Sequence, residues 1–302
     1  MDMNKYKRMK KFLIFTVILL IIFMSATGFL IYANYDYLAF KYLMTRQYIY
    51  TDTLDKIYDK YLKINPEGNY MKYFDDLVIA LSTIGITFEN KDKYTYLYIP
   101  ETYAAYKSYT KDKGLQTETY ELDDKTLYMC LTNFSTFSSD MVKKNLDTMK
   151  QYDNIIIDLR NNSGGRVDIM QKISSYFLPK GDIIAKTQYR NKLTVQKSRT
   201  KQILTYDNII ILQSSSTASA SENLIVALKE NLDNVTLIGE TTFGKGIGQM
   251  TIPLKEGYAV KATTLQWLSP KGNNIHETGI NPDIPYTGPN SIDFALEYLK
   301  EK

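Results

Sequence analysis

The longest apolar stretch of the chain lies close to its start. Residues 12–33 carry no charged side chain, and five lysines and arginines lie among the eleven residues before them. A helix of about 20 apolar residues can cross a bilayer, and basic flanking residues stay on its cytoplasmic side. We therefore expect residues 1–11 to be a cytoplasmic tail and residues 12–33 to be a single-pass anchor in the cell membrane. Everything after the anchor should be extracytoplasmic.

A cleaved signal peptide would explain the same apolar stretch. The apolar core of a signal peptide has about 7–15 residues and ends at a cleavage site of small residues. The stretch here is longer, and bulky residues occupy most positions near Ala26 and Ala33. These two differences favour an anchor.

Between the anchor and residue 125 the apolar residues show a helical spacing. Two faces repeat at i, i+3, i+4 and i+7, one formed by Leu54, Ile57, Tyr58, Tyr61 and Leu62, the other by Tyr70, Phe74, Leu77, Val78 and Leu81. This spacing predicts helices within residues 36–83. A weak strand pattern follows at residues 94–99. No residues there suggest chemistry, so we interpret residues 34–125 as a helical region and a connector.

From residue 126 onward, short apolar strands alternate with helical segments. The predicted strands are residues 127–131, 154–159, 208–213 and 235–238, and the predicted helices include residues 139–152, a segment ending at 177, one after the serine-rich turn, and a last one with Ser291 as its N-cap. Apolar strands that alternate with helices predict an α/β fold with a largely parallel sheet. We expect residues 126–302 to form one such domain.

Charge and composition exclude several classes of function. Subtracting the five cations and one anion of residues 1–11 from totals of 37 and 33 leaves 32 of each sign, so the basic patch typical of nucleic-acid binding is missing. The single cysteine, Cys130, lies in an apolar strand and should be a buried thiol. With one cysteine and one histidine, His276, the chain offers no Cys- or His-rich metal site. We expect no cofactor and no nucleic-acid partner.

Two turns after predicted strands could carry chemistry. Ser214–Ser221 lies between a strand and a helix, where free N–H groups and the helix dipole would stabilise an oxyanion formed by a serine nucleophile. Small hydroxyl residues at this place can equally be plain helix caps. Residues 161–165 end in two glycines, which present N–H groups to a ligand or simply form a tight turn.

A third turn, residues 239–246, nearly matches the phosphate-binding loop of nucleotide-binding proteins. Gly246 stands where that loop needs a hydroxyl for magnesium, and no helix follows promptly, so we exclude nucleotide binding. Lys245 then needs another explanation. A glycine-flanked lysine beside a buried strand can lose its charge through desolvation and act as a general base for a serine. An ordinary solvated lysine is the alternative.

The order and spacing of four stretches resemble the C-terminal processing peptidases, also called tail-specific proteases. The matching stretches are IIIDLRNNSGG (155–165), TASASENLIVAL (217–228), LIGETTFGKGIGQ (237–249) and GINPDI (279–284). These serine peptidases use a Ser–Lys dyad on a crotonase-like α/β core of the ClpP/crotonase type. The resemblance therefore implies that fold for residues 126–302.

The resemblance also implies roles for individual residues. Ser219 would be the nucleophile, Lys245 its general base, and Gln249 a residue that orients the lysine. The oxyanion hole would be formed by the backbone N–H groups of Ala220 and of Gly164 or Gly165. His276 lies outside the four stretches, and we expect it to be structural.

Many members of this family carry a PDZ domain before the catalytic core. Only residues 84–125, about 40 residues, are available here, which is less than an ordinary domain. We infer that the PDZ domain is absent. The sequence thus predicts a membrane-anchored extracytoplasmic serine endopeptidase acting on polypeptides. A non-catalytic peptide-binding or scaffold protein on the same fold and an esterase are the alternatives, and the oligomeric state stays open.

Overall fold

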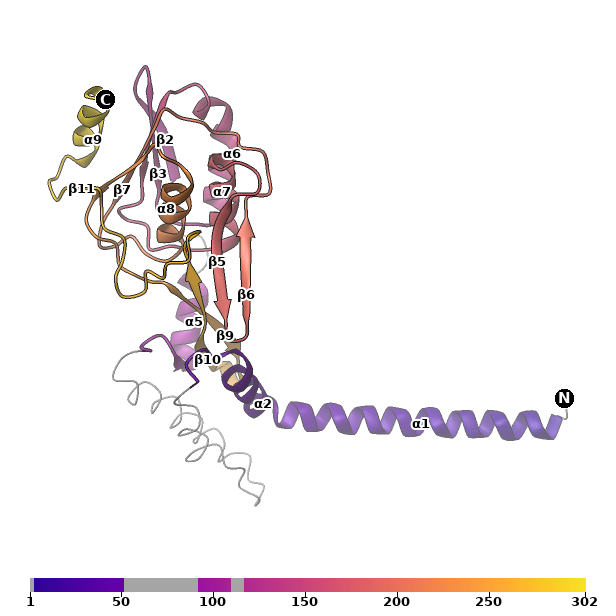
Figure 1. Ribbon diagram of the computed structural model, residues 1–302. Helices are drawn as coiled ribbons and strands as arrows, with labels where there is room; N and C mark the ends of the chain where they lie inside the picture. Colours follow the sequence, from indigo (N-terminus) through magenta and orange to yellow (C-terminus); the bar gives the residue numbers. More distant parts are fainter. Residues whose placement is uncertain (1–2, 52–91, 110–116) are drawn as a thin grey trace. The chain divides into compact units, whose positions relative to one another are not determined.

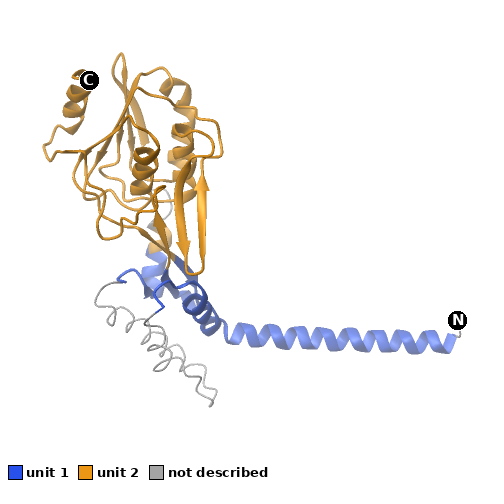
Figure 2. Ribbon diagram, in the orientation of Figure 1, with its two compact units in different colours: residues 1–105, 250–263 blue, residues 106–249, 264–302 orange. Residues whose placement is uncertain are grey.

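The computed structural model describes residues 3–51, 92–109 and 117–302. The chain divides into two compact units, residues 1–105 with 250–263 (unit 1) and residues 106–249 with 264–302 (unit 2) (Figure 2). The helical faces predicted between residues 54 and 81 lie outside the described residues.

Unit 1 begins with a long apolar helix, α1 (Met3–Ala33; Figure 1). Its side chains are almost all exposed. Its length and composition would allow it to cross a membrane, and none of its most apolar window is buried. The predicted apolar helix is therefore confirmed, and it starts earlier than residue 12 because the basic residues before the apolar stretch are also helical.

The rest of unit 1 forms a small hydrophobic core, whose first elements follow α1 in the sequence. It contains α2 (Tyr35–Tyr42), the π-helix η1 (Leu43–Gln47) and β1 (Tyr96–Tyr98), which pairs with residues 259–261 of β10 (Ala259–Leu268). β1 confirms the strand expected at residues 94–99. The 3-10 turn η2 (Lys255–Gly257) joins β9 (Ile247–Pro253) to β10, and the unit boundary falls within both strands. Fully buried side chains of this core include Phe40, Leu43, Met44, Tyr48 and Val260.

Unit 2 contains a six-stranded sheet in the order β11-β8-β7-β4-β3-β2. Its strands are β2 (Thr117–Asp123), β3 (Thr126–Leu131), β4 (Asn154–Asp158), β7 (Asn208–Gln213), β8 (Val235–Gly239) and β11 (Ile284–Pro285). All neighbours from β11 to β3 are parallel, and β2 is an antiparallel edge strand. The predicted α/β fold with a largely parallel sheet is confirmed.

Helices cover both faces of this sheet (Figure 1), which explains why its inner strands β3, β4, β7 and β8 are mostly apolar and buried. Alternate residues of a strand point to opposite faces. In β4, Ile155 and Ile157 pack in the cluster of α6 (Thr136–Met149), α7 (Val167–Phe177) and α8 (Ala220–Asn231). Ile156 packs on the other face in the cluster of α9 (Ser291–Lys300). Burying each such side chain stabilises the fold by about 1.5–3 kcal/mol.

Two helix boundaries differ from the sequence prediction. α6 starts three residues earlier than expected, because Ser135 caps it in a reciprocal pair of hydrogen bonds with Ser138. The last helix has Asn290 at its N-cap position, so the prediction of Ser291 as the cap was wrong by one residue. Cys130 is half-buried rather than fully buried.

A hairpin that the sequence analysis missed completes unit 2. β5 (Ile183–Tyr189) pairs with β6 (Lys192–Lys197) and, on its other side, with residues 265–268 of β10, always antiparallel. β6 reads KLTVQK and alternates between exposed and half-buried residues, without a buried apolar face. A hydrophobic pattern therefore could not reveal it. α5 (Pro100–Tyr109) was missed as well.

Candidate active site

Ser219 lies at the end of the serine-rich turn, immediately before α8. Its backbone angles are φ 59° and ψ −117°, a left-handed conformation that costs a residue with a Cβ of order 1–3 kcal/mol. Hydrogen bonds from the turn hold this conformation: Thr217 Oγ1 donates to the carbonyl oxygen of Leu159 (2.8 Å), and the Ala218 N–H donates to that of Asn162 (3.1 Å). The half-exposed side chain of Ser219 is thus fixed at a helix N-terminus, where negative charge is stabilised.

The glycine loop after β4 packs directly against this turn. A Cβ built on Gly164 would lie 2.9 Å from the Cβ of Ser219 and 2.9 Å from the carbonyl oxygen of Ala218. Gly165 lies against Phe134 in the same way, with 2.5 Å to its carbonyl oxygen. Both glycines have positive φ, so close approach and backbone conformation each require glycine.

Asn162 determines which of the two glycines has a free N–H. The fully buried Asn162 side chain donates to the carbonyl oxygen of Leu131 (2.9 Å) and accepts the N–H of Gly164 (2.9 Å). Neither the Gly165 N–H nor the Ala220 N–H has an acceptor within the described parts of the chain. Gly165, rather than Gly164, is therefore the candidate to form an oxyanion hole with Ala220.

A buried carboxylate joins the serine to the lysine loop. Glu222 on α8 is fully buried and accepts four hydrogen bonds, from the N–H groups of Ser219 (2.7 Å), Gly244 (2.7 Å) and Lys245 (2.9 Å) and from the hydroxyl of Thr242 (2.6 Å). One oxygen, Oε2, binds both the Ser219 and Lys245 N–H groups. Their backbone nitrogens therefore lie within about 6 Å of each other.

Sequence reasoning missed Glu222 as a site residue. The available signal was its place three residues after Ser219, the N3 position from which a glutamate can bond back to the backbone of a helix cap. The capping pattern predicts only the bond to Ser219. The bonds to Thr242, Gly244 and Lys245 come from the fold.

The loop between β8 and β9 carries Lys245, which is half-buried, and β9 carries Gln249. The Nε2 atom of Gln249 is buried and has no hydrogen-bond partner among the residues that the structure describes. This loop also contacts the segment with His276, since the Glu277 N–H donates to the Gly244 carbonyl oxygen (2.8 Å). The lone histidine thus lies nearer to the lysine loop than the sequence indicated.

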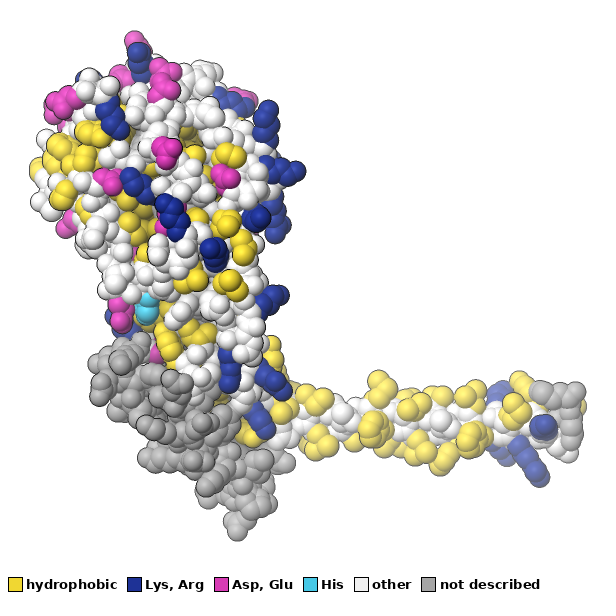
Figure 3. Space-filling view, in the orientation of Figure 1, with side chains coloured by type: hydrophobic (Ala, Val, Ile, Leu, Met, Phe, Trp, Pro, Cys, Tyr) yellow, Lys and Arg dark blue, Asp and Glu magenta, His cyan; other side chains and the backbone are white. Residues whose placement is uncertain are grey.

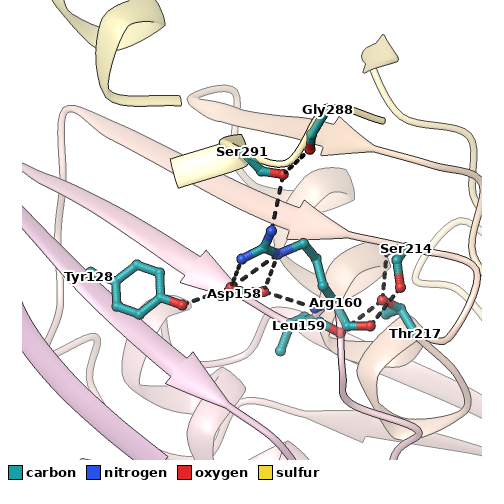
Figure 4. Close-up of polar contacts among 8 residues, drawn as sticks. All are labelled: Tyr128, Asp158, Leu159, Arg160, Ser214, Thr217, Gly288 and Ser291. Carbon is teal, nitrogen blue, oxygen red and sulfur yellow. Dashed lines mark hydrogen bonds and ion pairs between the residues drawn. The ribbon is translucent and has the colours of Figure 1, made fainter. Parts of the chain in front are cut away.

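An ion pair between buried Asp158 and half-buried Arg160 supports the serine-rich turn (Figure 4). Asp158, at the end of β4, accepts hydrogen bonds from Arg160 Nη2 (2.6 Å) and from the Tyr128 hydroxyl (2.7 Å). Burial, and then the Asp158 carboxylate, raise the pKa of Tyr128 far above its ordinary value. The Ser214 hydroxyl donates to the carbonyl oxygen of Arg160 (2.6 Å), and Nη1 of Arg160 donates to Ser291 Oγ (3.0 Å). Arg160 thus connects the turn to the start of α9.

No cluster of three or more His, Cys, Asp or Glu side chains that could hold a metal is present in the described ranges.

Comparison with protein families gives a match to the model of peptidase family S41 over residues 125–286. Among curated proteins, the chain is 32% identical over 179 residues to carboxy-terminal processing protease CtpB of Bacillus subtilis (strain 168), covering 58% of this chain and 36% of the relative. It is 35% identical over 173 residues to CtpA of the same organism, covering 56% and 36%. The chain therefore spans 36% of the length of each of these relatives.

Solved structures share the fold. A photosystem II D1 C-terminal processing protease matches with a TM-score of 0.64 at 16% identity, covering 80% of this chain and 89% of that one. A lipoprotein from Streptococcus agalactiae matches with a TM-score of 0.63 at 18% identity, covering 85% and 92%. The predicted resemblance to C-terminal processing peptidases is confirmed. The crotonase-like detail and the absence of a PDZ domain stay predictions.

Proposed function

The chain belongs to peptidase family S41, and from this premise we propose that it is a serine endopeptidase that cleaves polypeptides through an acyl-enzyme on Ser219. The strained conformation of Ser219 at the start of α8 carries the proposal, together with the shared contact of Ser219 and Lys245 to Glu222. Strained nucleophiles at a strand-to-helix turn are typical of acyl-transfer enzymes.

In the proposed mechanism, neutral Lys245 takes the proton of Ser219 as Oγ attacks the carbonyl carbon of the peptide bond. The N–H groups of Ala220 and Gly165 stabilise the oxyanion, a contribution of about 100- to 1000-fold in rate per donor in comparable enzymes. Collapse breaks the C–N bond, and the lysine returns the proton to the leaving amine. Water then attacks the acyl-enzyme with Lys245 again as base, which releases the carboxylate and restores Ser219.

Gln249 has a place in this mechanism. Its Nε2 is a buried donor that lacks an acceptor among the described residues, and such a donor costs free energy unless it finds one. The other orientation of the same amide would place its oxygen here, and we assign Oε1 of Gln249 as the acceptor of an N–H from Lys245 Nζ. This hydrogen bond would orient the lysine and leave the single lone pair of the neutral amine free to take the proton of Ser219.

The proposal includes a place in the cell. The apolar helix α1 would anchor the chain in the cell membrane, with the tail at residues 1–11 in the cytoplasm and unit 2 outside it. External protease added to intact cells should then degrade unit 2. Protection of unit 2 until the cells are lysed would contradict this orientation.

Labelling of the full-length protein by a fluorophosphonate tests the nucleophile. Wild type should be labelled, and Ser219→Ala should not. Ser216→Ala is the matched control, because Ser216 is an exposed serine of the same turn, and it should be labelled like wild type. Labelling of Ser219→Ala would rule out the assignment. Peptide and ester substrates with the same acyl group separate a peptidase from an esterase, and absence of labelling in folded wild type would favour a scaffold protein.

A further inference from the structure

The β5–β6 hairpin and its flanking residues are strongly basic. Residues 180–201 carry seven basic side chains and one acidic one, namely Lys180, Lys186, Arg190, Lys192, Lys197, Arg199, Lys201 and Asp182. Outside the N-terminal tail, this leaves 25 of the 32 cations and 31 of the 32 anions elsewhere in the chain. The positive charge of the extracytoplasmic part is therefore concentrated here, and Figure 3 shows lysine and arginine side chains gathered along one side of the molecule.

Three of these basic groups are exposed to solvent on or next to β6. Lys192, Lys197 and Arg199 are exposed, and the ion pairs found among the described residues involve other side chains. Leu193 and Val195, between the lysines, are also exposed, at 51% and 45%. The outer side of β6 therefore combines positive charge with a small apolar surface.

Among the strands that the structure describes, β6 lies at the edge of its sheet. The order β10-β5-β6 leaves one side of β6 without a described partner strand. The hairpin is closed by the pair Tyr189 and Lys192 across a two-residue turn. In such a hairpin the closing pair is hydrogen-bonded, and non-hydrogen-bonded and hydrogen-bonded pairs then alternate along the strands. Leu193 and Val195 stand in non-hydrogen-bonded pairs, so their N–H and C=O groups point away from β5.

This edge lies close to the candidate active site within unit 2. The N–H of Trp267 in β10 donates to the carbonyl oxygen of Gly246, the neighbour of Lys245 (3.1 Å). Trp267 pairs with Thr187 of β5, and Thr187 pairs with Thr194 of β6. Three strand spacings, about 14 Å in all, therefore separate β6 from the lysine loop, a distance that about four or five extended residues span.

We propose that the open edge of β6 binds an extended, acidic segment of the polypeptide substrate as an added strand. Backbone hydrogen bonds would hold the segment, and its carboxylates would face the lysines. Lysines on edge strands usually prevent pairing with another copy of the same protein. Here the repulsion between lysines excludes pairing with the β6 strand of a second copy. A strand with acidic side chains is attracted instead and is therefore the expected partner. An anionic bilayer would match the charge but would leave the outward backbone groups unused.

The proposal rests on the proposed peptidase function, and its test uses pairs of peptide substrates. Both peptides of a pair contain the same cleaved segment and an added extension. The extension is a run of glutamates in one peptide and a run of glutamines in the other. One pair carries it at the N-terminal end and a second pair at the C-terminal end. Wild type should show a severalfold lower KM for the acidic peptide at similar kcat. This gain, the lower KM of the acidic peptide relative to the glutamine peptide, should vanish in the double variant Lys192→Glu/Lys197→Glu. It should also become smaller as the salt concentration rises. Lys143→Glu/Lys144→Glu on α6 is the matched control and should keep it, because these lysines are equally exposed.

A second pair of variants tests strand addition itself. Val195→Pro removes an outward N–H, which an edge strand tolerates, and should abolish the gain. Val195→Ala keeps the N–H and should retain most of it. Cleavage of the peptide without an extension should be the same in all variants. A gain that survives Val195→Pro, or survives the double charge reversal, overturns the proposal.

Binding measured without cleavage keeps the two proposals apart. Anisotropy of the fluorescent acidic peptide with Ser219→Ala protein should show the same losses in the same variants. If wild type cleaves nothing but the acidic peptide still binds at β6, only the peptidase function fails. If the charge reversal instead removes binding to phosphatidylglycerol vesicles and leaves peptide binding unchanged, the surface binds lipid and the docking proposal is wrong.

Discussion

Replacing Glu222 with glutamine should reveal how much the site depends on one carboxylate. Glutamine has nearly the same shape, but an NH2 group replaces one of the two oxygens. Each oxygen of Glu222 accepts two hydrogen bonds, Oε1 from Thr242 and Gly244, and Oε2 from Ser219 and Lys245. In either orientation of the amide, two donors therefore face another donor.

The cost of this change follows from the geometry. The Thr242 hydroxyl can turn and accept, but a backbone N–H cannot, so one or two buried N–H groups stay unsatisfied. Each costs about 1–3 kcal/mol, which gives a loss of about 1–6 kcal/mol in the free energy of unfolding. A domain with an ordinary stability of about 5–15 kcal/mol remains folded. Loosening of the Ser219 and Lys245 loops should lower kcat/KM by about 100-fold, the size expected for a displacement of about 1 Å.

Thermal melting, kcat/KM and the rate of fluorophosphonate labelling measure these effects. Glu240→Gln is the matched control, because Glu240 is an exposed glutamate on the loop that leads to Lys245. It should stay within about 0.5 kcal/mol of wild type and keep its activity. If folded Glu222→Gln is labelled at the wild-type rate, Glu222 does not position the nucleophile and the base.

Three further changes test other parts of the site. Lys245→Arg should abolish peptide cleavage because a guanidinium group stays protonated, whereas His276→Ala should keep most activity; the opposite result in kcat/KM assays would require a histidine mechanism. Gly164→Ala should destabilise the protein by about 1–3 kcal/mol in melting experiments and impair cleavage, since its φ of 110° and its contact with the turn exclude a Cβ. Burial, and then the charge of Asp158, raise the pKa of Cys130. Alkylation of the folded protein should therefore need a higher pH than the ordinary thiol value of about 8.5, and unfolding should restore that value.

The parallel sheet could be predicted because its strands are apolar on both faces. The run Ile155–Ile157 supplies side chains to two helical layers, and a local pattern is enough to recognise such a strand. The β5–β6 hairpin gives no such signal, since neither of its faces is fully covered. Ser291 was assigned as a helix cap from its residue type, but its hydroxyl is bonded to Arg160, a contact across 131 residues that no local pattern contains.

The candidate site divides in the same way. Ser219 and Lys245 could be proposed from sequence because each stands in a short motif whose order along the chain is informative. Glu222 was not found, since its bonds to residues 242–245 depend on how α8 meets the loop after β8. Sequence also left the choice between Gly164 and Gly165 open. The structure favours Gly165 as the candidate, because the Asn162 side chain accepts the N–H of Gly164.

Strand order explains why motifs so far apart in sequence meet. The glycine loop follows β4, the serine turn follows β7 and the lysine loop follows β8, and these strands lie side by side in the order β8-β7-β4. Loops at the carboxyl ends of adjacent parallel strands share one edge of the sheet, where such folds carry their sites. The proposed nucleophile, after the middle strand, therefore has the proposed base on one side and the proposed oxyanion loop on the other. The connection from α8 to β8 lies at the opposite edge of the sheet, so changes in the length of this connection should leave the chemistry intact. A shift of β7 relative to β8 and β4 should impair the chemistry, because it would move the three loops apart.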